Sequence, residues 1–192
     1  MARSKEFDEH VVLDKAMKLF WKQGYAQTSM NDLVEHMGIH RRSLYDTFTD
    51  KHTLYLKALD RFGERITGRW ASGIQGAGTA EEALRFIFDF VIKGEDDSPP
   101  GCFFVNSAVE LAHTDKEVDA KAVDECAQTE RILQEVVTRG QLNGEFAESG
   151  DAKALAEYLY IVITGLRVMV RTSTPETKLF RIAEQSIQML KR

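Results

Sequence analysis

Residues 19–54 constrain the fold of this chain more than any other segment, because they hold two short amphipathic helices joined by a glycine. Within 33–37, apolar residues recur at i, i+1 and i+4, the stripe of a short helix. Gly38 follows, and glycine ends a helix in a left-handed turn at least cost. Leu44 and Phe48 then give a second helix its buried side. The segment therefore predicts a helix-turn-helix.

The exposed face of the second helix is rich in hydrogen-bond donors. His40, Arg41, Arg42, Ser43 and Thr47 are all left for this face. A helix that presents such donors after a tight turn suits insertion into a DNA major groove. Each arginine offers a planar fork for guanine or phosphate, although two solvated arginines on an exposed helix are the plainer interpretation.

The order of residues in this part of the chain resembles the TetR family of one-component transcriptional regulators. The resemblance covers roughly the first third of the chain. Its matching positions are Leu19, Phe20, Gly24, Tyr25, Thr28, Ser29, Leu33, Gly38, Ile39, Leu44, Tyr45, Phe48, Lys51 and Leu54. The remainder is similar to the family only in length and helical character.

This resemblance implies an all-α protein of two parts. Residues 1–50 would form a three-helix DNA-binding domain, and 51–192 a helical effector-binding and dimerisation domain that opens with a linker helix at 51–72. The implied function is a homodimeric repressor that binds an inverted repeat in double-stranded DNA. An unknown small-molecule effector would release it from this operator. Whether one or two dimers bind, and whether the protein represses or activates, stay open.

The candidate DNA contacts extend beyond the recognition helix. Thr28 stands at a helix N-terminus, where it can bind a phosphate with its hydroxyl and amide, only cap the helix, or do both. Lys51 begins the next helix as a phosphate clamp. The expected DNA-binding residues are Thr28, Ser29, His40, Arg41, Arg42, Ser43, Tyr45 and Lys51.

Three residues depart from the family pattern. His40 replaces a small capping residue, Arg42 replaces a small residue, and Asp46 adds a negative charge near the expected phosphates. The operator sequence therefore cannot be carried over from a relative.

Net charge does not identify a DNA binder, because residues 1–70 hold 12 basic against 10 acidic residues and the whole chain has a formal net charge of −5.

The rest of the chain reads as further helices without strand-like alternation. Gly73, Gly76 and Gly78 predict the end of the linker helix near residue 71. Thr79 and Thr114 each precede a glutamate by three residues, which predicts two capping boxes. Asp151 and Thr174 are expected to cap the last two helices.

Several classes of protein have no support in the sequence. No apolar run is long enough to span a membrane, and the charged N-terminus lacks a signal peptide. No catalytic triad, phosphate-binding glycine loop or zinc pair is present, so we expect no enzyme, no cofactor and no metal. Two cysteines make no disulfide framework. The expected location is the cytoplasm.

The last two predicted helices carry more apolar surface than a monomer needs, and relatives of this kind dimerise through them. The expected dimer residues are Leu155, Leu159, Val162, Leu166, Leu179, Ile182, Ala183, Ile187 and Leu190, although part of this stripe is core on the plainer interpretation.

Polar residues beside aromatic ones on apolar helices suggest an effector pocket or a merely solvated face. The expected ligand residues are Phe103, Asn106, Glu110 and Tyr158.

Two alternatives to a ligand-responsive repressor remain. Cys102, at a predicted helix N-terminus, predicts a thiol- or electrophile-sensing regulator if the helix dipole stabilises its thiolate. The acidic loop before it and the phenylalanines after it favour an inert, buried cysteine instead. A helical interaction protein that merely keeps the fold is the third hypothesis.

Overall fold

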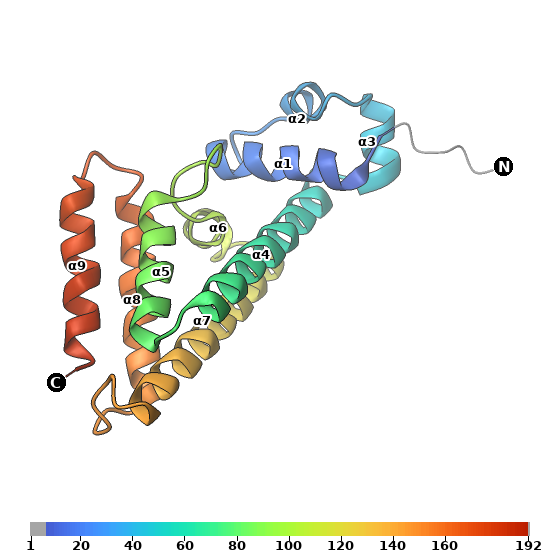
Figure 1. Ribbon diagram of the computed structural model, residues 1–192. Coiled ribbons are helices and arrows are strands. Elements are labelled where there is room, and N and C mark those ends of the chain that lie inside the picture. Colours follow the sequence, from blue (N-terminus) through green and yellow to red (C-terminus); the bar gives the residue numbers. More distant parts are fainter. Residues whose placement is uncertain (1–6, 192) are drawn as a thin grey trace.

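The computed structural model describes residues 7–191, and every regular element in that range is an α-helix (Figure 1). The helices are α1 (Glu9–Gln23), α2 (Met30–Met37), α3 (Arg41–Phe48), α4 (Lys51–Gly76), α5 (Ala80–Lys93), α6 (Phe103–Leu111), α7 (Lys116–Leu142), α8 (Ala152–Met169) and α9 (Glu176–Met189). The all-α prediction is confirmed. None of the helices in this range is both long and apolar enough to cross a membrane.

Local signals in the sequence account for most helix boundaries in the first part of the chain. The Asp8 carboxylate caps α1 by accepting from two backbone amides. Ser29 and Asp32 form a reciprocal capping box that opens α2, and Gly38 ends that helix in the left-handed conformation. His40 precedes α3 without a side-chain cap, as its departure from the family pattern suggests. These caps fix the turn between α2 and α3.

The helix α4 is longer than the sequence suggested. It continues to Gly76, past the expected end near residue 71. The physical reason is a close approach between helices: a Cβ at position 73 would lie 2.1 Å from the Phe86 ring. Gly73 therefore lets α5 pack against α4 and does not break the helix.

Two further capping predictions need correction. Thr79 and Glu82 do form a capping box for α5, but Asp115, not Thr114, caps α7 through the amides of Glu117 and Val118. The Thr114 hydroxyl instead donates to the Leu111 carbonyl at the end of α6. The last helix begins at Glu176, one residue later than the Pro175 start that the sequence predicted.

The apolar side chains form two core clusters that meet at Ile66 in the middle of α4. The first joins α1–α3 and the beginning of α4 to Cys102–Val105 of the α6 region and to Val118 of α7. The second joins the rest of α4 to α5, α7, α8 and α9. Figure 1 shows α6 lying between α1 and the remaining bundle. Thus α6 shares the hydrophobic core of the N-terminal helices.

Candidate nucleic-acid interface

The recognition helix α3 is held by two buried anchors and presents its polar side chains outward. Leu44 and Phe48 are completely buried, whereas Arg41, Arg42 and Tyr45 are exposed. The division follows the i, i+4 spacing of the anchors, because residues four apart lie on one helix face. An exposed polar face on a helix fixed from beneath is the geometry that major-groove readers use.

Arg41 is already oriented by its neighbours. Its Nη1 donates to Asn31 Oδ1 at 2.8 Å, and its guanidinium lies 5.7 Å from the centre of the Tyr45 ring. An oriented guanidinium loses less side-chain freedom when it binds a base or a phosphate. Asn31 was not predicted from the sequence, although it stands only ten residues before Arg41, across the turn.

Arg42 lies almost entirely in solvent. Its side chain is 90% exposed and its Nε lies 3.7 Å from the carboxylate of Asp46, one turn further on. An ion pair this exposed contributes little to stability. The Asp46 carboxylate therefore moderates the charge of Arg42 without fixing its position.

Thr28 does not belong to the exposed face. Its side chain is 0% exposed, and its hydroxyl donates to the Gly24 carbonyl at 2.6 Å. Its backbone amide is also occupied, by the Tyr25 carbonyl. The expectation that Thr28 reaches a phosphate is therefore corrected: it closes the turn between α1 and α2. Ser29, the exposed cap of α2, stands beside it.

Lys51 lies at the start of α4 against an aromatic ring. Its Nζ is 4.2 Å from the centre of the Tyr25 ring, a cation–π contact. Partial burial lowers the pKa of Lys51, while the negative charges of Glu110 and Asp32 oppose that change. The charge of Lys51 also acts on Asp32, in the first turn of α2.

A carboxylate from α6 binds the turn between α1 and α2. Glu110 Oε2 accepts from the Tyr25 amide at 3.0 Å, and Oε1 accepts from the Ala26 amide at 2.7 Å. Gly24 is required here, because its φ is +86° and a Cβ would lie 2.8 Å from Glu110 Oε2. We call this arrangement the Glu110 clamp. The Gly-Tyr pair was visible in the sequence, but its partner 85 residues away was not.

A second polar contact joins the same two regions. His52 Nε2, on α4, lies 2.7 Å from Asp115 Oδ2, at the cap of α7. The Asp115 carboxylate also accepts the Glu117 and Val118 amides that begin α7. Together with the Glu110 clamp, this pair connects the N-terminal helices to α6 and α7.

The chain matches the profiles of two families over most of its length. Residues 12–58 match "Bacterial regulatory proteins, tetR family", and residues 80–185 match "Tetracyclin repressor-like, C-terminal domain". The chain belongs to the TetR family. It is a DNA-binding transcriptional regulator, as its resemblance to that family implied.

Individual relatives agree with this family. The HTH-type transcriptional repressor ComR of Escherichia coli (strain K12) is 33% identical, over 97% of this chain and 90% of ComR. The HTH-type transcriptional regulator YezE of Bacillus subtilis (strain 168) is 34% identical, over 83% of this chain and 84% of YezE. A cysteine mutant of the TetR family regulator CifR, solved with 26-bp double-strand operator DNA, has a TM-score of 0.86. It is 27% identical and covers 98% of this chain and 100% of that one.

The apolar residues of α8 and α9 divide into two faces. Six of the nine expected dimer residues are buried within the chain itself: Leu159, Leu166, Leu179, Ala183, Ile187 and Leu190. A partner cannot reach them, and this part of the expectation is corrected. The large apolar side chains of the two helices that are exposed are Tyr158, Ile161, Val168, Ile182 and Met189. Leu155 and Val162 lie between the two faces and are half-buried.

The four residues that were expected to bind a ligand make other contacts in the structure. Phe103 packs edge-on against Tyr55 in the N-terminal core. Asn106 Nδ2 donates to the Trp21 carbonyl at 3.4 Å, and Glu110 forms the clamp. Tyr158 lies on the exposed face, where its hydroxyl contacts Met189 Sδ at 3.5 Å. Three of the four thus connect α6 to the DNA-binding helices.

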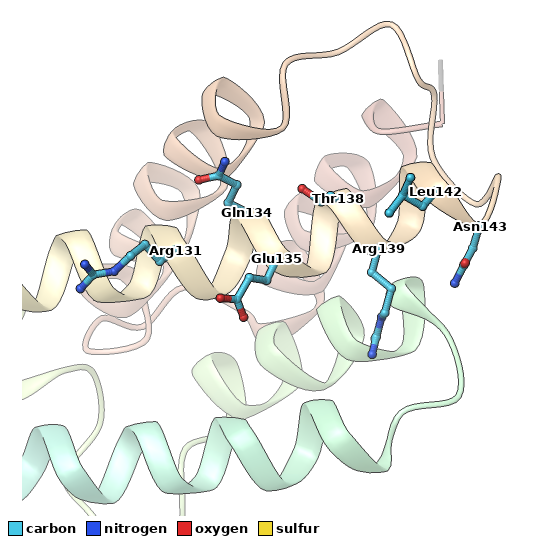
Figure 2. Close-up of a pocket in the computed structure, with 7 residues that line it drawn as sticks. All are labelled: Arg131, Gln134, Glu135, Thr138, Arg139, Leu142 and Asn143. Atoms are coloured by element: carbon cyan, nitrogen blue, oxygen red, sulfur yellow. The ribbon is translucent and has the colours of Figure 1, made fainter.

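Hollows in the surface lie along α7 instead. A shallow depression of about 510 Å³ is lined by Arg131, Gln134, Glu135, Thr138, Arg139, Leu142 and Asn143. Figure 2 shows Glu135 and Arg139 leaving α7 on the side of α4, whereas Gln134 points the other way. A second hollow, of about 410 Å³, lies between α4 and α7, and we call it the α4–α7 groove. Its lining residues are Thr67, Ala71, Ile74, Gln128, Ile132, Glu135, Val136 and Arg139.

Cys102 does not have the surroundings of a reactive thiol. It is 1% exposed, and burial raises the pKa of its thiol although the Arg167 guanidinium opposes that change. Thiolate is the reactive form, so burial and a raised pKa both suppress its reactions. No group of three or more histidine, cysteine or acidic residues that could hold a metal ion occurs within residues 7–191.

Proposed function

We propose that the protein is a homodimeric repressor that binds an inverted-repeat operator through α3 and leaves it when a small molecule binds the C-terminal helices. The observation that carries the proposal is α3 itself, with buried anchors and an outward Arg41 held by Asn31. The name of ComR and the operator complex of CifR support repression and duplex binding. Such a regulator works in the cytoplasm, where it meets DNA.

The surface that we propose to contact DNA consists of Ser29, His40, Arg41, Arg42, Ser43, Tyr45 and Lys51. Arg41 and Arg42 supply forks for guanine or phosphate, and Lys51 supplies a charge for the backbone. The hydroxyls of Ser29, Ser43 and Tyr45 donate to phosphates. Most of these side chains are exposed, and Ser43 and Lys51 are half-buried.

The dimer is proposed to form through the exposed apolar face of α8 and α9. Ile161 is 67% exposed in the middle of α8, and Ile182 and Met189 continue the face on α9. Apolar surface of this kind is normally covered by a partner. A two-fold axis between two such pairs of helices gives a four-helix interface and places one α3 on each side.

The test is footprinting on DNA from upstream of the gene, together with a band shift of the same fragment. We expect protection of two half-sites centred about one helical turn, ~34 Å, apart. Protection of a single asymmetric half-site by monomeric protein would contradict the proposal. A reporter gene fused to the promoter distinguishes repression from activation. If the protein is a repressor, deletion of the binding site should raise expression of the reporter.

A further inference from the structure

The two arginines that begin α3 are held in different ways. Arg41 Nη1 donates to Asn31 Oδ1 of α2 at 2.8 Å, and Arg41 Nη2 donates to the Tyr45 hydroxyl at 3.4 Å. Arg42 Nε lies 3.7 Å from the Asp46 carboxylate, and both of these side chains are largely exposed. The first arrangement restrains the guanidinium at two nitrogen atoms, whereas the second is a loose ion pair in solvent.

The restraint on Arg41 comes from two helices whose relative position is itself fixed. Tyr45 follows Arg41 by four residues, so the two side chains share one face of α3. Asn31, the second residue of α2, reaches Arg41 from across the turn. Lys15 of α1 donates to the Met37 carbonyl at the end of α2, at 3.2 Å, and thereby supports that turn. The position of the Arg41 guanidinium is therefore set by α2 as well as by α3.

Arg41 keeps the groups that base recognition requires. The Asn31 amide carries no charge, so it orients the guanidinium without offsetting its positive charge. A guanidinium has five N–H groups, and the contacts with Asn31 and Tyr45 use two of them. Guanine presents two acceptors, O6 and N7, at fixed positions in the major groove, and the remaining N–H groups of an arginine can bind both.

The place of Arg41 on α3 favours a base over a phosphate. It is the first residue of α3, and the N-terminal residues of a recognition helix are the ones that contact base edges. A contact with the phosphate backbone needs mainly a positive charge, which the mobile Arg42 supplies. Discrimination between bases needs a fork whose position is fixed, and Arg41 has one.

From these observations we infer that Asn31 is a positioning residue for sequence recognition: it holds Arg41 in the pose that binds a guanine, while Arg42 binds the phosphate backbone of any sequence. The inference rests on the proposed function, because it assigns roles within the surface that we propose to contact DNA. Each half-site of the operator should then contain a G·C pair whose recognition depends on a side chain of α2.

The experiment is a selection from a library of random-sequence DNA duplexes with the full-length protein, followed by sequencing of the bound fraction. The parent protein should enrich an inverted repeat with a preferred G·C pair in each half-site, by about 10- to 100-fold over the other bases. Arg41→Ala should abolish this preference. Asn31→Ala should reduce it about fivefold to tenfold at the same base pair, as the loss of a hydrogen bond to a charged group implies. Arg42→Ala should keep the preference and weaken binding to all sequences alike.

Conservative variants separate positioning from charge and from folding. Arg41→Lys keeps the positive charge but lacks the fork, so the G·C preference should be lost while the salt dependence stays near that of the parent. Asn31→Asp keeps an acceptor for Arg41, so the preference should survive, while the added negative charge weakens binding to every sequence. Asn31 and Arg41 are both exposed, so these changes leave the core intact. Asn143→Ala, at the exposed end of α7, is the control and should behave as the parent.

Three outcomes overturn the inference. They are an unchanged preference at every base pair in Asn31→Ala, uniform weakening without loss of preference in Arg41→Ala, and loss of the G·C preference in Arg42→Ala. A parent protein that enriches no repeat contradicts the proposed function and this inference with it. A parent that enriches a repeat while Asn31→Ala keeps every preference contradicts this inference alone, so the two failures are distinguishable.

Discussion

Glu110 Oε2 lies 3.0 Å from the backbone nitrogen of Tyr25, and this hydrogen bond joins α6 to the turn that precedes the helix-turn-helix. The same carboxylate accepts the Ala26 amide. One side chain of the C-terminal part thus fixes the position of the turn from which α2 begins. A displacement of α6 would therefore move the turn and, with it, the DNA-binding helices.

Replacement of Glu110 by glutamine should weaken both folding and DNA binding. The amide offers one acceptor and turns its NH₂ group toward a backbone N–H, so we expect a loss of about 1–2 kcal/mol in the free energy of unfolding. Urea denaturation and fluorescence anisotropy with operator DNA measure the two effects. Glu148→Gln, at an exposed position on the loop before α8, is the control. Equal operator affinity in Glu110→Gln and the parent would contradict the clamp.

Arg41 and Lys51 should affect DNA binding in different ways. Arg41→Ala is expected to cost about 1–3 kcal/mol per half-site and to relax preference at one base pair if the guanidinium reads a base. Lys51→Ala should weaken binding to all sequences alike and lower the salt slope by roughly one per contact. Arg131→Ala, on the exposed face of α7, serves as the charge control. Anisotropy over a series of salt concentrations and operator variants separates the outcomes.

Ile161→Glu should dissociate the dimer. The substitution places a charge at the centre of the exposed face of α8, where a two-fold contact would bury it beside its own copy. We expect a monomer in sedimentation equilibrium and loss of operator binding, with an unchanged circular dichroism spectrum. Val123→Glu, at a 59% exposed position of α7, should remain dimeric. A dimeric Ile161→Glu protein would place the interface elsewhere.

Glu184 on α9 should contribute to acid stability through its ion pair with Arg85 on α5. The guanidinium lowers the pKa of Glu184 to about 2. A carboxylate with a depressed folded-state pKa stabilises the protein above the unfolded value of about 4.3, and this contribution is lost as the pH falls toward 2. Because the two side chains are 40% and 45% exposed, we expect less than about 1 kcal/mol.

Thermal melts of Glu184→Gln between pH 7 and pH 2 measure this contribution. The melting temperatures of variant and parent should differ at neutral pH and converge as the pH approaches 2. High salt should reduce the difference. A difference that grows toward low pH would have the wrong sign for this mechanism.

Cys102 should react slowly in the folded protein. Burial raises the pKa of its thiol, so at pH 8 less thiolate is present than in a free cysteine. We expect alkylation by iodoacetamide to be more than about tenfold slower in the native protein than in urea. In Cys102→Ser only Cys126 remains to react, so comparison with the parent protein assigns each alkylation rate to its cysteine. Rapid native alkylation of Cys102 would favour the thiol-sensing alternative.

The sequence was most informative where the signals are local. Gly38, the Ser29 cap and the Leu44–Phe48 pair lie within a few residues of the structure they specify, so the helix-turn-helix could be predicted. Leu159 and Ile161 show the limit. Both are apolar residues on one helix, and the sequence alone does not tell which of the two the rest of the chain covers.

The Glu110 clamp was beyond prediction for a related reason. Glu110 carries the same carboxylate as any solvated glutamate, and its role arises from two amides that are 84 and 85 residues away. Thr28 was misassigned because an N-terminal threonine that binds phosphate and one that closes a turn have the same sequence.

The position of α6 has a consequence for recombination between regulators of this family. Cys102–Val105 and Val118 complete the hydrophobic core that holds α1–α3. In a chimera with its crossover at residue 50, the transplanted helices α1–α3 would therefore pack against the α6 of another protein. Such a chimera would lose the Glu110 clamp and expose part of its apolar core. A graft that carries α6 and the beginning of α7 together with the N-terminal helices would keep both, and its operator specificity would travel with it.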